Sequence, residues 1–154
     1  MRLGFRIKHY FFNAFRELFV HHHGSLEFRA RIFALMIVVN RKISVQNYIV
    51  VKQQALEIYK GDEDRANLLL LSTKELVTKI QENNGGDVSV LIKSIQKELK
   101  LAPRYAKKID IESLEAFLNL ADSEETYLYQ KNILEFLEKL KNETLKIKPK
   151  QKEE

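Results

Sequence analysis

Glycine and proline are scarce in this chain, and their scarcity is the strongest constraint on its fold. The 154 residues include five glycines and two prolines. A β-sandwich or β-barrel turns about every ten residues and needs many more of these turn formers. Apolar residues make up 45% of the chain, which is ample for one core in a domain of this size. The sequence therefore predicts an all-α fold, a compact bundle of about seven helices.

Apolar residues at spacings of three and four mark the expected helices. These cover approximately residues 3–20, 25–39, 44–59, 62 or 64 to 80, 87–99, 110–121 and 123–142. The expected N-caps are Ser25, Ser44, Asp87 and Asp110, and the expected C-terminal stops are Gly24 and Gly61. The loop at 83–86 is the clearest in the chain, and Pro103 marks a turn or a short helix. The last helix is expected to direct inward Leu128, Ile133, Leu134, Phe136, Leu137 and Leu140.

Composition divides the chain into three parts. Residues 1–25 are a basic, aromatic, amphipathic helix, and residues 26–142 are the helical domain. Residues 143–154 carry mostly charged side chains, so we expect a disordered tail there.

The first expected helix combines cationic and aromatic side chains. Its candidate contacts to an anionic surface are Arg2, Arg6, Lys8 and Arg16, and its candidate contacts to a partner or a membrane are Phe5, Phe11, Phe12, Phe15 and Phe19. Such a composition is typical of an interfacial membrane helix. Two other interpretations remain open, namely a core helix whose aromatic rings fill the bundle and a docking surface for a partner or a second copy.

Charge is distributed unevenly along the chain. Residues 1–60 contain ten Lys or Arg and three acidic residues, whereas residues 61–154 contain sixteen and eighteen. The basic first part suggests contact with lipid head groups or nucleic acid, or simply a solvated basic face. Nucleic acid is the less favoured partner, because no recognisable docking motif accompanies the charge.

Two stretches 82 residues apart resemble each other. Each consists of an apolar helix, a polar turn, a hydroxyl residue and a second helix. In this alignment Asn40 falls on Asp122, and Ser44 falls on Thr126. The sequence thus predicts an internal helix–turn–helix duplication.

This doubled pattern resembles the TerB-like domains of tellurite-resistance proteins and DjlA-type co-chaperones. The segments that carry the resemblance are 120–125, which reads Leu-Ala-Asp-Ser-Glu-Glu, 39–44, which reads Val-Asn-Arg-Lys-Ile-Ser, and the acidic stretch 61–65. The resemblance covers about residues 28–142. It implies a helical interaction module in the bacterial cytoplasm, related to stress or to the envelope. No His-Pro-Asp tripeptide is present, so the J domain of the co-chaperones is not on this chain.

The resemblance also raises the question of a metal site, because the acidic turns of the family are thought to bind divalent cations. Such binding needs several converging carboxylates. Here Asn40, Arg41 and Lys42 occupy the first turn, so the site is at best half preserved in Asp122, Glu124 and Glu125. We expect no metal, and we interpret the three acids as a helix N-cap and first-turn charges.

Signals of catalysis are not found. The chain has no cysteine, no phosphate-binding loop and no zinc-protease motif. Adjacent residues on a helix diverge by about 100°, so His21, His22 and His23 cannot all bind one ion there. These histidines form a basic helix end or are an engineered remnant. We therefore expect no enzyme activity and no cofactor.

The resulting hypothesis is a non-enzymatic TerB-like module that presents a bundle surface to a protein partner or to a second copy. The alternative is a peripheral membrane protein held by its first helix. The longest apolar run, residues 32–39, is far shorter than the roughly 20 residues of a membrane span. No cleavable leader is apparent, so we expect the cytoplasm, with a possible peripheral position at the inner membrane.

Overall fold

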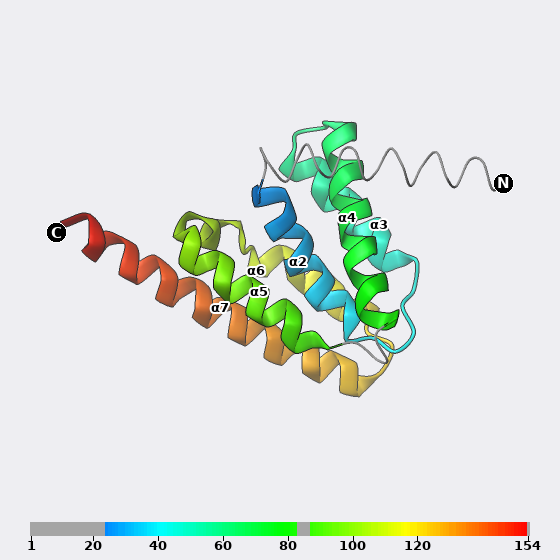
Figure 1. Ribbon diagram of the computed structural model, residues 1–154. Helices are drawn as coiled ribbons and strands as arrows, with labels where there is room; N and C mark the ends of the chain where they lie inside the picture. The colour runs from blue at the N-terminus through cyan, green and yellow to red at the C-terminus, as the bar shows by residue number, and fades with distance from the viewer. Residues whose placement is uncertain (1–23, 83–86, 154) are drawn as a thin grey trace.

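The computed structural model describes residues 24–82 and 87–153, which form a helical bundle (Figure 1). Within these residues there are six α-helices, two 3-10 helices and no strand. The elements are α2 (Gly24–Val38), α3 (Gln46–Ile58), α4 (Glu63–Glu82), α5 (Val88–Leu101), η1 (Pro103–Lys108), α6 (Ile111–Leu114), η2 (Glu115–Leu120) and α7 (Glu124–Glu153). The predicted all-α class is confirmed. The expected helix at 3–20 lies outside the described residues.

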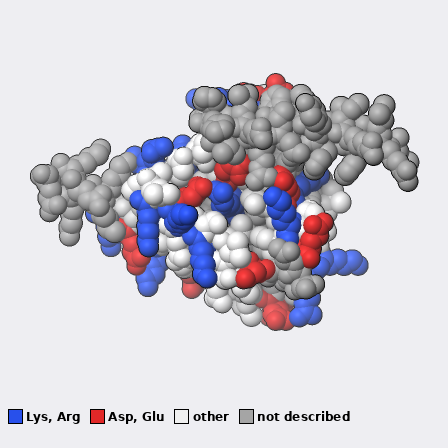
Figure 2. Space-filling model, viewed as in Figure 1, with Lys and Arg blue, Asp and Glu red and all other residues white. Residues whose placement is uncertain are grey.

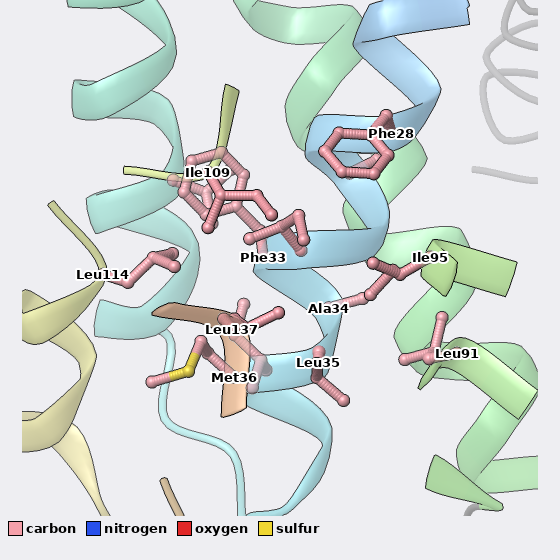
Figure 3. Close-up of a cluster of buried hydrophobic side chains, with 14 of the residues drawn as sticks. Phe28, Phe33, Ala34, Leu35, Met36, Leu91, Ile95, Ile109, Leu114 and Leu137 are labelled. Carbon is pink, nitrogen blue, oxygen red and sulfur yellow. The ribbon is translucent and has the colours of Figure 1, made fainter. Parts of the chain in front are cut away.

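Helix α2 is the centre of the bundle. Most of its side chains are buried, including Phe28, Leu35 and Met36, so it is apolar on nearly every side. Such a helix must be surrounded by other elements. It packs against α4, α5, η1 and α7. Figure 3 shows Leu91 and Ile95 of α5 on one side of α2, and Ile109, Leu114 and Leu137 on the other.

The other helices cover α2 from two directions. Helices α3 and α4 pack on each other and lie along one flank, while α5 and α7 lie along the other (Figure 1). The short pair α6 and η2 joins the two halves, since η2 contacts both α3 and α7. Helix α7 runs the full length of the bundle and projects beyond it at the C-terminal end.

Several helix ends follow the sequence prediction. Asp87 accepts a hydrogen bond from the Ser89 amide, and Asp110 accepts one from the Ser113 amide, as N-caps do. At the end of α3 the amide of Gly61 donates to the Leu56 carbonyl, and Lys60 adopts a left-handed φ of 52°. The Lys60 amide also donates to the Glu57 carbonyl, and these two hydrogen bonds together form a Schellman motif, a common helix ending. Asp62, rather than Asp64, then begins α4 by accepting from the Arg65 amide.

Four predicted features of the helix ends are wrong. Gly24 and Ser25 are both helical residues of α2, so Gly24 is not a C-terminal stop and Ser25 is not an N-cap. At the start of α3 no side chain caps the helix, and the Ser44 hydroxyl accepts from the Asn47 side chain instead. At the other end of the chain α7 continues to Glu153, so residues 143–153 are helical and not the predicted disordered tail.

The inward face of α7 also differs from the prediction at one position. Ile133, Leu134 and Leu137 are buried, but Leu128 is 55% exposed. The buried positions nearest to it are Thr126 and Gln130. Because Leu128 lies midway between them in the chain, it projects on the opposite side of the helix.

Candidate functional site

The two polar turns that the sequence alignment pairs lie against each other. The turn after α2 contains Asn40, Arg41 and Lys42, and the turn before α7 contains Asp122. The Asp122 amide donates to Asn40 Oδ1 over 3.0 Å. In return, Asp122 Oδ2 accepts from the amides of Arg41 and Lys42 at 2.8 and 2.9 Å. The two aligned residues thus contact each other directly across 82 positions of sequence.

Asp122 also holds the first turn of α7. Its Oδ1 accepts from the Thr126 hydroxyl at 2.5 Å, while the Thr126 amide donates to the Ser123 hydroxyl at 3.1 Å. Ser123 is therefore the residue whose side chain caps α7, in place of Asp122. We call Asn40, Arg41, Lys42, Asp122 and Thr126 the clasp. It ties the end of α2 to the start of α7.

The C-terminal end of α2, next to the clasp, is buried and accepts hydrogen bonds from two side chains. Asn40 is 3% exposed, and its Nδ2 donates to the Ile37 carbonyl at 3.0 Å. The buried Gln130 of α7 donates to the Met36 carbonyl at 2.8 Å. These are carbonyls of the last helical turn, which have no partner within the helix itself. Side chains from the turn and from α7 therefore complete the end of α2.

The hydrogen bonds of the clasp stabilise the ionised form of Asp122. The Thr126 hydroxyl is the largest cause that lowers the pKa of the Asp122 carboxyl below its usual 3.8, and the amide of Lys42 is the next. Burial opposes this effect, but less strongly than either of these two hydrogen bonds lowers the pKa. An ionised carboxylate is the stronger acceptor for backbone amides.

The donors around Asp122 fit a structural contact better than a cation site. Both of its oxygens already accept hydrogen bonds, and the facing turn supplies backbone amides, which repel a cation. Glu124 and Glu125 are exposed on the first turn of α7, where the helix dipole favours acids. Among the described residues, no group of three or more His, Cys, Asp or Glu could hold a metal ion.

Two hollows open beside the clasp. One, of about 480 Å³, is lined in part by Val39, Arg41, Val88 and Tyr129. The other, of about 190 Å³, shares Val39, Arg41 and Tyr129 and borders Asp122. Tyr129 is 47% exposed. We call Val39, Val88 and Tyr129 the apolar patch.

Sequence reasoning missed the apolar patch. The run Tyr127-Leu128-Tyr129 was available as a signal, because three consecutive apolar residues cannot all face a core from one helix. All three are exposed, and the Tyr127 ring lies 5.6 Å from the Lys131 ammonium group. The predicted contact residues, Arg2, Arg6, Lys8, Arg16 and the five phenylalanines of that segment, lie outside the described residues, as do His21–His23.

Comparisons with family models, curated proteins and solved structures find no significant match to this chain. The TerB-like resemblance therefore stays a prediction. Within residues 24–82 and 87–153, no helix has an apolar stretch long enough to cross a bilayer.

Proposed function

We propose that this chain is a non-enzymatic helical interaction module that binds a protein partner through the apolar patch. The observation that carries this proposal is the pair of hollows that share Val39, Arg41 and the exposed Tyr129. Exposed apolar groups that border a concave surface are typical of docking sites. Tyrosine and arginine are also enriched among the residues that dominate binding energy.

The clasp supports this role because it orders the turn on which Val39 and Arg41 lie. Four residues of that turn and of α7 are connected by the hydrogen bonds of Asp122. A surface ordered before binding loses less conformational freedom on association, so less of the interaction energy is spent on ordering it. The clasp and the patch would then act together, one as support and the other as contact.

The chemistry of the surface indicates what the partner must offer. Arg41 lines both hollows, and its guanidinium group makes no hydrogen bond or ion pair with a described residue. A matching segment would place apolar side chains against Val39 and Tyr129 and a carboxylate beside Arg41. On the face shown in Figure 2, basic and acidic side chains are interspersed over the described part.

A random peptide library displayed on phage tests the proposal while the partner is still unidentified. Peptides selected on the full chain are expected to be apolar with an acidic residue. Their affinity should fall at least tenfold on Tyr129→Ala and on Arg41→Ala. Leu101→Ser is the matched control, because Leu101 is 76% exposed on α5 but does not line either hollow.

Three results would overturn the proposal. Selected peptides could bind Tyr129→Ala as tightly as the unaltered chain, or lose as much affinity on Leu101→Ser. Light scattering could also reveal a dimer that Tyr129→Ala dissociates, which would assign the patch to self-association.

The membrane alternative depends on residues 1–23, which lie outside the described part. It predicts that the full chain floats with vesicles of anionic lipid and that removal of residues 1–25 abolishes flotation. If the full chain floats and Tyr129→Ala has no effect on any peptide, the membrane interpretation replaces the interaction module.

A further inference from the structure

A separate hollow lies between α2, α3, η1 and the residues around α6, away from the clasp. Its volume is about 220 Å³. Arg29 and Lys108 supply cationic groups to its lining, and Ile32, Phe33, Ile58 and Leu114 supply apolar ones. Phe33 and Leu114 are buried core residues, so the apolar part of the lining is continuous with the core (Figure 3).

The two cations of this hollow make no hydrogen bond or ion pair with any of the described residues. Arg31, two residues beyond Arg29 on α2, behaves differently, because its guanidinium group pairs with Glu98. Both arginines are half-buried. Glu98 forms an ion pair with Arg31, whereas no described acid forms one with Arg29.

The folded protein destabilises the charged forms of Arg29 and Lys108. Burial lowers the pKa of Arg29, and the negative charges of Tyr59 and Asp110 only partly oppose this. Burial also lowers the pKa of Lys108, and repulsion from Arg29 and Arg104 lowers it further. A low pKa in a cation means that the folded protein disfavours its charged form. A bound anion would oppose these effects, because its negative charge favours the charged forms of both groups.

Two acids also line the hollow, and neither forms an ion pair with these cations. The carboxylate of Asp110 caps α6, where it accepts from the Ser113 amide at 3.3 Å and from the Ser113 hydroxyl at 2.6 Å. Glu57 is exposed on α3. Both acids moderate the positive potential, so an anion would bind with modest affinity.

We propose that this hollow binds a small organic anion. A carboxylate or phosphate head group would lie between Arg29 and Lys108, and a compact apolar body would pack against Ile32, Phe33 and Leu114. The guanidinium plane of Arg29 suits two-point contact with either head group. The size agrees, because one water occupies about 30 Å³ and the hollow therefore holds roughly seven to eight atoms of that size.

Titration of the full isotope-labelled chain, followed by amide NMR signals, tests this site. The probes are benzoate and phenyl phosphate, which share an aromatic body and differ in head group. Benzyl alcohol is the neutral control. We expect saturable shifts around Arg29 and Lys108 with a Kd of about 1 mM or lower for at least one anion. The stronger of the two anions identifies the head group.

Variants separate charge recognition from simple filling of an apolar hollow. Arg29→Gln and Lys108→Gln should each weaken binding about tenfold, while the adjacent, exposed Lys107→Gln should leave it unchanged. If Arg29→Gln does not fold, Arg29→Lys keeps the charge and should still weaken binding by loss of the two-point contact. Benzyl alcohol that binds as tightly as benzoate, equal losses in Lys107→Gln, or no saturable shift would each overturn the proposal.

Discussion

The clasp and the hollow lined by Arg29 and Lys108, which we call the cationic hollow, differ in how a charged side chain is bonded. Asp122 is exposed, yet its carboxylate accepts two amide hydrogen bonds and one from a hydroxyl. Arg29 is half-buried, yet it has no hydrogen bond or ion pair with any described residue. A charge whose bonds are made within the fold stabilises the fold, whereas a buried charge without bonds costs stability unless something else binds it. The contrast assigns a structural role to Asp122 and a binding role to Arg29.

The largest expected effect is the loss of the clasp. Asp122→Ala removes the acceptor for the Arg41 and Lys42 amides and for the Thr126 hydroxyl, so we expect a loss of about 2 kcal/mol. Asn40→Ala should cost a similar amount, because it leaves the Asp122 amide and the Ile37 carbonyl without that partner. Urea unfolding measures both losses.

The double variant sharpens this test. Because the two side chains belong to one hydrogen-bonded unit, the losses should not add, and a coupling of at least about 0.5 kcal/mol is expected. Fully additive losses would show that the turns are held independently of each other.

A smaller effect should follow from acid. The folded pKa of Asp122 is lowered, so its contribution is present above the unfolded value near 3.8 and is lost as pH falls through the folded value. Asp110 shifts in the same direction, chiefly because the Ser113 hydroxyl donates to it. Stability should therefore decline below about pH 4. Asp122→Asn should flatten part of that decline in a urea titration repeated at several pH values, and an unchanged profile would contradict the assignment.

Much of the helical framework was accessible from sequence because it depends on local chemistry. Asp87 and Asp110 were predicted as N-caps, and they cap their helices through residues two or three positions away. Ser25 is not a cap because α2 begins at Gly24, one residue before it. The alignment of Asn40 with Asp122 indicated two equivalent turns, although nothing in the pattern required those turns to touch.

The two proposed binding surfaces were less accessible, for a physical reason. Arg29 and Lys108 are far apart in sequence and meet only because η1 packs against α2. Val39, Val88 and Tyr129 likewise belong to three separate segments of the chain, the turn after α2, α5 and α7, and line one hollow only in the folded protein.

The smallest expected effect concerns the cationic hollow without a ligand. Arg29→Met replaces an unpaired, half-buried charge with an apolar chain of similar length, so stability should be unchanged or rise by up to about 0.5 kcal/mol. Lys108→Gln should behave in the same way, because it removes the repulsion from Arg29. Arg31→Met is the comparison, since it breaks the pair with Glu98 and should be destabilising. Equal losses in Arg29→Met and Arg31→Met would remove the distinction between the two arginines.

The most direct test of this contrast is the melting temperature of Asp122→Ala beside that of Arg29→Met in the same buffer. We expect a Tm about 4–8 °C lower for Asp122→Ala, and a Tm for Arg29→Met equal to or above that of the unaltered chain. A fall of similar size in Arg29→Met, or no fall in Asp122→Ala, would contradict the roles assigned to the two residues.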